Sequence, residues 1–308
     1  MTRILIVGAG ATGGTLGARL LSAGREVTFL VRERRAEQLA ANGLRYSAPG
    51  EQQTHRVHAV TSLAGLAPFD LVIITVKAPA LKALLPTLAP AIGPGTLVLP
   101  LLNGMSHLEL LERTFPGRVL GGLIRVVATF HAAGEVEQMT SLCTLSLGGL
   151  GAAAVPAPIR AVLDVEGINL EVDPEITARL WEKWAFIAAA GVVTCLFRGT
   201  VGDILAAGGE VQIRQAITEG ELIAQAAGYP VSQAAHHQSL GLLTEPGSAF
   251  TSSLYRDLQH GDPQEAEHLI GDFAAHAARL NVAAPLLNVT LLQLRTHKQA
   301  LIRAKAAS

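Results

Sequence analysis

The chain has 308 residues, a length that favours two domains, each large enough to bury its own core. It is 49% hydrophobic and 16% charged, which excludes the polar composition of a disordered protein. The formal net charge is −1, so no overall field attracts nucleic acid or an acidic membrane surface.

No segment predicts a membrane span, a secretory signal or a metal site. The longest apolar stretch, Ala185–Phe197, is too short to cross a bilayer, and the apolar run Met1–Gly8 stops too early for a signal peptide. Cys143 and Cys195 lack the spacing of metal ligands or of a disulfide framework, so we expect both to be buried as small hydrophobic residues. We therefore expect a cytoplasmic protein without a metal.

The first half of the chain alternates short hydrophobic runs with segments of helical spacing. Nearly continuous apolar runs, typical of strands covered on both faces, occupy Arg3–Gly8, Glu26–Val31, Asp70–Lys77 and Thr96–Leu101. Helices are predicted at Thr12–Ala23, Ala36–Asn42 and Ala80–Ala91. This order predicts an α/β fold, a doubly wound parallel sheet of the Rossmann type with crossover helices.

Later segments divide the chain into an α/β part and an all-α part. Strands are expected at Val119–Phe130, Glu135–Met139 and Thr144–Leu147, with a hairpin at residues 132–134 and a helix at Ala152–Val162. From Ile176 onward the pattern has a helical period, at Ile176–Phe197, Gly209–Ala227, Ser232–Leu243, Ser252–His260, Pro263–Leu280 and Ala284–Ala304. We expect a Rossmann domain over residues 1–172 and a helical domain over residues 173–308.

A glycine-rich turn separates the first strand from the first helix. Its residues are Gly8, Ala9, Gly10, Ala11, Thr12 and Gly13, and they match the G-x-G-x-x-G pattern in the context that the pattern requires. The first glycine permits a tight turn, the second lets the backbone approach a pyrophosphate, and the third lets the helix pack closely on the strand. The helix N-terminus then favours phosphate, so the turn predicts a dinucleotide site.

The end of the second strand indicates which dinucleotide binds. An NAD enzyme typically carries Asp or Glu there, whereas this chain has Arg32, followed by Arg34 and Arg35. A guanidinium matches a 2′-phosphate in geometry and charge, which favours NADPH. Glu33 comes one residue late, and a solvated basic turn is the alternative interpretation.

Three further polar residues are candidates for the chemistry. Lys77 and Asn103 follow strands of the same predicted sheet, at the carboxyl edge where ligands bind, although either residue is also common in an exposed turn. Lys183 lies in an otherwise apolar helix and could protonate a ketone as hydride reaches its carbon. A lysine whose ammonium group reaches solvent is the alternative for Lys183.

The chain resembles the ketopantoate reductase (2-dehydropantoate 2-reductase) family. The resemblance runs through nearly the whole chain and rests on ordered blocks: the Gly8–Gly13 turn, Arg32, Thr75–Ala78, Leu102–Met105, Trp181–Lys183, Ser252–Asp257 and Glu265. It implies a Rossmann domain followed by a helical domain like the C-terminal domain of 6-phosphogluconate dehydrogenase. It also implies NADPH-dependent reduction of ketopantoate to pantoate, in the pantothenate pathway.

The same resemblance implies roles for individual residues. Lys183 would act as general acid on the ketone, and Glu265 would orient that lysine and bond near the substrate hydroxyl. Ser253 would hold the substrate carboxylate, Asn103 would meet the nicotinamide ribose, and Lys77 would assist cofactor placement. On local pattern alone, Glu265 could instead belong to a capping box beginning at Asp262, and Ser253 could cap its helix.

The resemblance weakens beside Lys183. Typical members carry asparagines four and eight residues after the catalytic lysine and a third ten residues further on, where this chain has Ile187, Gly191 and Val201. Residues at this spacing share a helix face, so we expect a more apolar substrate wall, which Gly191 would make roomier. A site without those hydrogen-bonding groups discriminates less for a hydroxylated substrate.

Four functions are therefore weighed. Ketopantoate reduction comes first, and NADPH-dependent reduction of a different, less polar 2-oxo acid is the alternative that Ile187 and Gly191 motivate. A non-catalytic NADPH-binding regulator is disfavoured because Lys183, Ser253 and Glu265 are all present, and a relative of the 6-phosphogluconate and 3-hydroxyacid dehydrogenases is disfavoured by the blocks above. The expected partner is a small 2-oxo acid, with neither nucleic acid nor membrane, and the apolar helical half makes a homodimer plausible.

Overall fold

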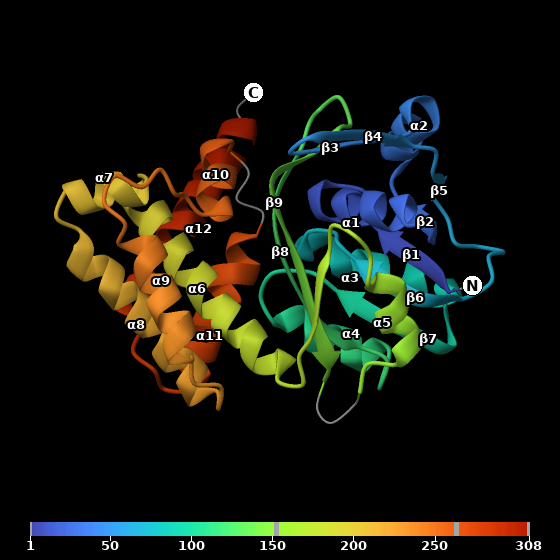
Figure 1. Ribbon diagram of the computed structural model, residues 1–308. Coiled ribbons are helices and arrows are strands. Elements are labelled where there is room, and N and C mark those ends of the chain that lie inside the picture. Colours follow the sequence, from blue (N-terminus) through green and yellow to red (C-terminus); the bar gives the residue numbers. More distant parts are fainter. Residues whose placement is uncertain (1, 151–153, 262–264, 307–308) are drawn as a thin grey trace. The chain divides into compact units, whose positions relative to one another are not determined.

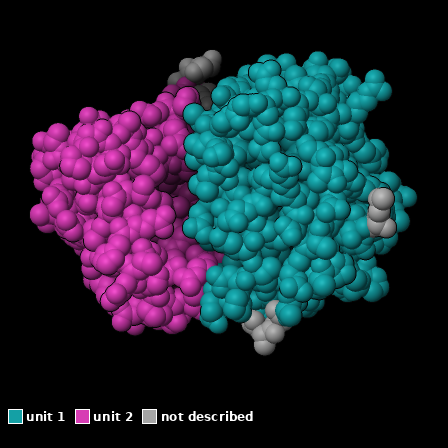
Figure 2. Space-filling view, in the orientation of Figure 1, with its two compact units in different colours: residues 1–102, 107–177 teal, residues 103–106, 178–308 magenta. Residues whose placement is uncertain are grey.

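The chain forms two compact units in a computed structural model that describes residues 2–150, 154–261 and 265–306 (Figure 1). The first unit comprises residues 1–102 and 107–177, and the second comprises residues 103–106 and 178–308 (Figure 2). A short loop between a strand and a helix of the first unit thus belongs, by its contacts, to the second. The expected division into functional domains at residue 172 stays a prediction.

The first unit contains a five-stranded parallel sheet in the order β5-β2-β1-β6-β7. Its strands are β1 (Arg3–Val7), β2 (Glu26–Leu30), β5 (His58–Val60), β6 (Phe69–Ile74) and β7 (Ile92–Pro100). The strand order reverses between β1 and β6, which places ligands at the carboxyl edge of a Rossmann-type sheet. The predicted fold class is confirmed, although the short strand β5 was not anticipated.

The described residues of this part of the chain include five α-helices. They are α1 (Ala11–Ser22), α2 (Glu33–Asn42), α3 (Ala78–Leu88, followed by a 3₁₀ turn), α4 (Ser106–Thr114) and α5 (Ala157–Leu163). The sequence analysis missed α4. The start of the helix predicted at Ala152–Val162 falls outside the described residues, and the part that the structure describes begins at Ala157.

A second sheet covers helix α1. It has the order β10-β9-β3-β4, with β8 paired to β9, and comprises β3 (Leu44–Ala48), β4 (Glu51–His55), β8 (Leu120–Phe130), β9 (Val136–Gly149) and β10 (Asn169–Val172). β3, β4 and β10 were not predicted, and the break expected between Glu135–Met139 and Thr144–Leu147 is wrong, because β9 is continuous. The expected hairpin between β8 and β9 is confirmed.

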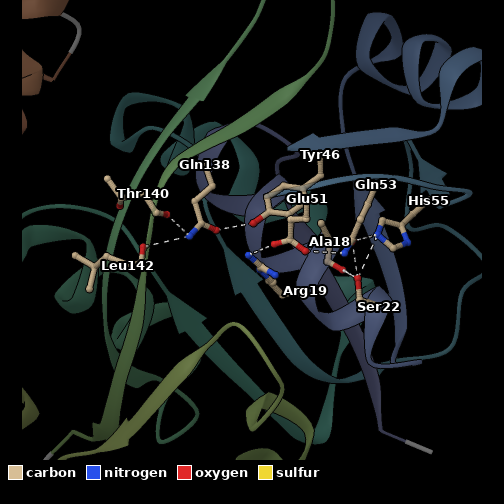
Figure 3. Close-up of polar contacts among 10 residues, drawn as sticks. All are labelled: Ala18, Arg19, Ser22, Tyr46, Glu51, Gln53, His55, Gln138, Thr140 and Leu142. Carbon is tan, nitrogen blue, oxygen red and sulfur yellow. Dashed lines mark hydrogen bonds and ion pairs between the residues drawn. The ribbon is translucent and has the colours of Figure 1, made fainter. Parts of the chain in front are cut away.

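A buried amide lies where the pairing of β9 with β8 is irregular. Gln138 is 1% exposed, and its Nε2 donates to the carbonyl of Thr140 at 2.6 Å while its Oε1 accepts from the Tyr46 hydroxyl (Figure 3). The side chain therefore supplies a partner to the backbone where the pairing with β8 is irregular, between Val126 and Ala128.

Helix α1 lies between the two sheets and contacts both. A Cβ on Gly17 would stand 2.2 Å from the Phe29 ring on β2, and one on Gly14 would stand 2.5 Å from Val136 on β9. Near its C-terminal end, Arg19 pairs with Glu51 on β4 and stacks over the Tyr46 ring (Figure 3). Glycines on both faces of α1 thus allow the two sheets to pack closely against the helix, and the contacts of Arg19 stabilise this packing.

All regular elements in the described residues of the second unit are helices or helical turns. Its elements are α6 (Ile176–Phe197), α7 (Val201–Ala206), α8 (Glu210–Ala226), α9 (Gln233–Leu243), α10 (Ser253–Gln259), a π turn (Glu267–Gly271), α11 (Asp272–Arg279) and α12 (Pro285–Ala306). Helix α6 begins in the first unit and is long and apolar enough to span a membrane. It extends beyond the apolar stretch Ala185–Phe197, which alone was too short to do so. Of its apolar window 67% is buried, as expected for a core helix.

A buried carboxylate fixes the start of α12. Glu219 on α8 is 5% exposed, and its two oxygens accept from the backbone N–H groups of Leu286 and Leu287, both at 3.1 Å. The side chain of Gln215 donates to the same carboxylate at 2.9 Å. Negative charge at the N-terminus of a helix is favourable, so Glu219 joins α8 to α12 electrostatically as well as by hydrogen bonds.

We expect Glu219→Ala to lower the free energy of unfolding by about 1–3 kcal/mol, because the N–H groups of α12 lose a buried acceptor. The matched control is Glu210→Ala on the same helix, which removes an exposed pair with Arg214 and should cost no more than about 0.5 kcal/mol. Urea unfolding followed by circular dichroism measures both values. Equal losses in the two variants would contradict the anchoring role of Glu219.

Candidate functional site

The candidate cofactor residues of the first unit gather at one edge of its parallel sheet. The Gly8–Gly13 turn follows β1, Arg32 follows β2 and Lys77 follows β6, and these three strands are neighbours. Gly8 adopts a φ of +102°, a conformation that residues with a side chain rarely adopt. The topology thus brings together three of the predicted groups.

The second and third glycines of the turn are surrounded differently. A Cβ on Gly10 would meet nothing within 4 Å, whereas one on Gly13 would stand 2.1 Å from the Gly8 carbonyl oxygen and 2.4 Å from the Thr75 hydroxyl. Gly10 is the N-cap of α1 and offers no side-chain acceptor to the first N–H groups of the helix. The turn therefore leaves space and backbone donors beside Gly10, while Gly13 is required by packing.

Thr75 fixes this turn, a role that the sequence analysis did not assign to it. Its hydroxyl lies 3.0 Å from the carbonyl oxygens of Val7 and Gly8 and donates to them. Thr75 directly follows β6, so the hydrogen bond joins the ends of two neighbouring strands. Nothing in the strand-like pattern Leu71–Lys77 separates this threonine from an ordinary strand residue.

Substitution should lower the free energy of unfolding more at Gly13 than at Gly10. Gly13→Ala should lower the free energy of unfolding by about 1–3 kcal/mol, because the new methyl group meets a backbone oxygen that cannot rotate away. Gly10→Val should cost less than about 1 kcal/mol, the loss of a favourable N-cap residue. Thermal unfolding of both variants measures the contrast, and a Gly10→Val protein less stable than Gly13→Ala would overturn it.

The basic residues after β2 do not form one exposed cluster. Arg32 is the N-cap residue of α2, and its side chain is exposed, as are those of Glu33 and Arg34. Arg35 instead turns inward, donating from Nε to the Ala9 carbonyl at 3.1 Å. Arg35 therefore does not belong to the exposed basic group that follows β2.

Arg35 has a structural role beneath the glycine turn. Its Nη1 donates to the Gly134 carbonyl at 2.8 Å, and its guanidinium lies over the Phe130 ring. Burial, with a smaller contribution from Arg45, lowers the pKa of Arg35 from its usual value. Arg35 therefore joins the turn to the β8–β9 hairpin, whereas Arg32 and Arg34 are exposed.

Lys77 and Asn103 mark the ends of two further strands. Lys77 is exposed and is the N-cap residue of α3, in extended conformation. Asn103 follows β7 and belongs by its contacts to the second unit. Its carbonyl oxygen accepts a hydrogen bond from Nε2 of His268.

In the second unit, Lys183, Ile187 and Gly191 share one face of α6. Lys183 is half-buried two turns into the helix, and Ile187 packs against the apolar core. Gly191 is buried, and a Cβ there would stand 3.3 Å from Ile270 and 3.5 Å from Leu254. The helix face is apolar at Ile187 and Gly191, but the expectation that Gly191 makes it roomier is wrong, because the Ile270 and Leu254 side chains occupy the space.

The two neighbours of Gly191 belong to the segments that carry the other candidates. Leu254 is next to Ser253 on α10, and Ile270 lies in the π turn that follows Glu265. The second unit therefore packs α6, α10 and the π turn together around Gly191. The third aligned position, Val201, is buried and donates its backbone N–H to Phe250, so it offers no polar group.

The capping alternatives have separate outcomes. Ser252, not Ser253, caps α10: its hydroxyl accepts from the N–H of Tyr255 at 3.0 Å and lies 2.7 Å from the Thr194 hydroxyl. Ser253 is exposed at the first helical position, so capping does not explain it. Glu265 is half-buried, and the capping box proposed for it begins at Asp262, outside the described residues.

The residues on either side of Lys183 hold α6 in place. Glu182 accepts from the N–H of Ser232 at 3.0 Å and from Arg179 at 2.7 Å. Burial raises the pKa of Glu182, but these hydrogen bonds outweigh it and the pKa falls below its usual value. Trp184, 1% exposed, donates its indole N–H to the Leu269 carbonyl at 3.0 Å.

The two cysteines are buried and unpaired, as expected. Burial raises the pKa of the Cys143 thiol and raises that of Cys195 to about 12, so neither supplies a reactive thiolate near neutral pH. Within the described ranges, no group of three or more His, Cys, Asp or Glu side chains could hold a metal ion.

Comparison with known families accounts for most of the chain. Residues 4–150 match the family model described as ketopantoate reductase PanE/ApbA, and residues 175–299 match the C-terminal model of the same family. The chain belongs to the ketopantoate reductase family. An uncharacterized oxidoreductase of Bacillus subtilis, YkpB, is 32% identical to this family member, over 96% of this chain and 99% of the relative.

Solved structures agree with this assignment. The 2-dehydropantoate 2-reductase of Geobacter metallireducens superposes on this ketopantoate reductase family member with a TM-score of 0.85 and 26% identity, covering 96% of this chain and 99% of that one. A D-mandelate dehydrogenase, solved with NADH and anilino(oxo)acetate, shares the fold with a TM-score of 0.86 at 20% identity, over 97% of this chain and 99% of that one.

Proposed function

We propose that this family member is an NADPH-dependent reductase that converts a 2-oxo acid to the 2-hydroxy acid, with ketopantoate as the first candidate substrate. The observation that carries the proposal is the packing of α6, which bears Lys183, against the segments that bear Ser253 and Glu265. The first unit would bind the cofactor and the second the substrate, which corresponds to functional domains over residues 1–172 and 173–308.

The cofactor would bind through the glycine turn and Arg32. The open space at Gly10 and the helix N-terminus beside it suit a pyrophosphate, since a Cβ there would fill the space and no side chain caps the helix. The exposed Arg32 suits a 2′-phosphate, and Lys77 and Asn103 would assist in binding the cofactor. When bound, the cofactor supplies the hydride.

The substrate would be held and protonated by residues of the second unit. Ser253 would bind the carboxylate, and Lys183 would give a proton to the ketone oxygen and stabilise the negative charge that develops there. Glu265 would orient the ammonium group of Lys183. The apolar wall at Ile187 and Gly191 supports a second candidate, reduction of a less polar 2-oxo acid, because a ketopantoate hydroxyl finds no hydrogen-bonding partner there.

A panel of 2-oxo acids tests the proposal. The purified protein, mixed with NADPH and each acid, should consume NADPH fastest with ketopantoate or, under the second candidate, with an acid that lacks the hydroxyl. Lys183→Ala should reduce the rate at least about 100-fold, the usual contribution of a general acid. The absorbance of NADPH gives the rates. Unchanged turnover in Lys183→Ala would remove the assignment of the general acid.

Replacement of Arg32 tests the choice of cofactor. Arg32→Ala should raise the Kd of NADPH about tenfold or more and leave that of NADH nearly unchanged, since only NADPH carries the additional phosphate. Titration with each dinucleotide measures the two constants, and Arg34→Ala shows whether the neighbouring guanidinium shares the role. If Arg32→Ala raises the Kd of NADPH and that of NADH equally, Arg32 does not select NADPH.

A further inference from the structure

His268 lies in the π turn between Glu265 and α11. In this turn the N–H of Asp272 bonds to the Glu267 carbonyl, five residues back, in place of the α-helical partner. The buried indole of Trp184 donates to the Leu269 carbonyl and so stabilises the irregular turn from α6. Single π turns within helices are frequent at functional sites.

The His268 ring faces an acceptor at each nitrogen. Nε2 bonds to the carbonyl oxygen of Asn103, and Nδ1 lies 3.1 Å from a carboxylate oxygen of Asp272. A carbonyl oxygen and an ionised carboxylate can only accept, whereas a neutral imidazole has a single N–H. Both contacts are satisfied together only when the ring carries two protons.

The Asn103 loop is shaped to receive the ring. Gly104 adopts a φ of +80°, and a Cβ there would stand 3.0 Å from Nε2 of His268. The side chain of His268 is 12% exposed, so the contact is largely shielded from water. Any larger residue at position 104 would strain the backbone and press on the ring.

The groups around the ring keep Asp272 ionised. Burial raises the pKa of Asp272, but hydrogen bonds from His268 and Ser106, with the charges of His268 and His276, outweigh it and lower the pKa. Asp272 thus stays ionised to lower pH than usual. On the adjoining turn, Glu267 is engaged by Arg295 through two hydrogen bonds, at 2.8 and 2.7 Å.

We propose that His268, as an imidazolium bridging the Asn103 carbonyl and Asp272, is a positioning residue that holds the Asn103 loop in the shape that receives the cofactor. The inference rests on the proposed function in one respect, the role of Asn103 toward the nicotinamide ribose. The bridge is complete while Asp272 is ionised and the ring holds both protons. Acid removes it by protonating Asp272, whose pKa lies below its usual value.

Nuclear magnetic resonance tests the bridge without reference to activity. In protein labelled with ¹⁵N-histidine, the His268 signals, assigned by their loss in His268→Gln, should show both ring nitrogens protonated near neutral pH. A ring with one unprotonated nitrogen there would overturn the proposal. This result is independent of whether the protein binds NADPH.

Binding titrations across a pH series test the positioning. His268→Phe should raise the Kd of NADPH roughly tenfold, as expected for loss of a charged hydrogen bond. His268→Gln, which still has an N–H for the Asn103 carbonyl, should recover most of the affinity but lose the acid decline that protonation of Asp272 causes in the native protein. The control His236→Phe removes another histidine–carboxylate pair of the same unit and should change neither value.

The outcomes are separable. Native affinity and native pH dependence in both His268 variants would overturn the positioning role. If His268→Phe fails to fold, the pH series of His268→Gln decides the question alone. Failure of the native protein to bind NADPH would refute the proposed cofactor, while the imidazolium bridge would still be judged by its resonance signals.

Discussion

The close contact of helix α1 with two sheets is the constraint on which the first unit depends. The helix packs against β2 at Gly17 and against β9 at Gly14, so side chains at these positions would drive the layers apart. The same helix presents its N-terminus at the glycine turn. The geometry of the candidate phosphate site is therefore fixed by packing along the whole helix and by the polar contacts of Arg19 at its other end.

Much of this arrangement could be predicted from sequence, for identifiable reasons. The buried strands β1, β2, β6 and β7 are nearly continuous apolar runs, and most helices of the second unit have a clear period, so both patterns are strong. The short helix α7 was not predicted. The strands β3, β4 and β10 are short or polar; β4 reads Glu-Gln-Gln-Thr-His and is stabilised by its partners, not by its own composition. β9 was predicted as two strands because Thr140 and Ser141 interrupt its apolar pattern, and its pairing with β8 is irregular at the same place.

The candidate site shows the same division between local and distant information. The φ of Gly8 and the packing of Gly13 follow from the local motif, whereas the inward turn of Arg35 requires the Gly134 carbonyl, far away in sequence. Nothing local distinguishes Ser252 from Ser253 as the cap of α10. His268 carried no signal at all, since its partner Asn103 is 165 residues away.

The unequal surroundings of Gly10 and Gly13 bear on how related sequences are interpreted. Packing alone preserves Gly13 in any chain that keeps this fold, whether or not it binds a dinucleotide. Gly10 is under no such demand, because the structure leaves room for a side chain there. A homologue that retains the later glycine and carries a bulky residue at the earlier one would therefore keep the architecture and have abandoned the nucleotide.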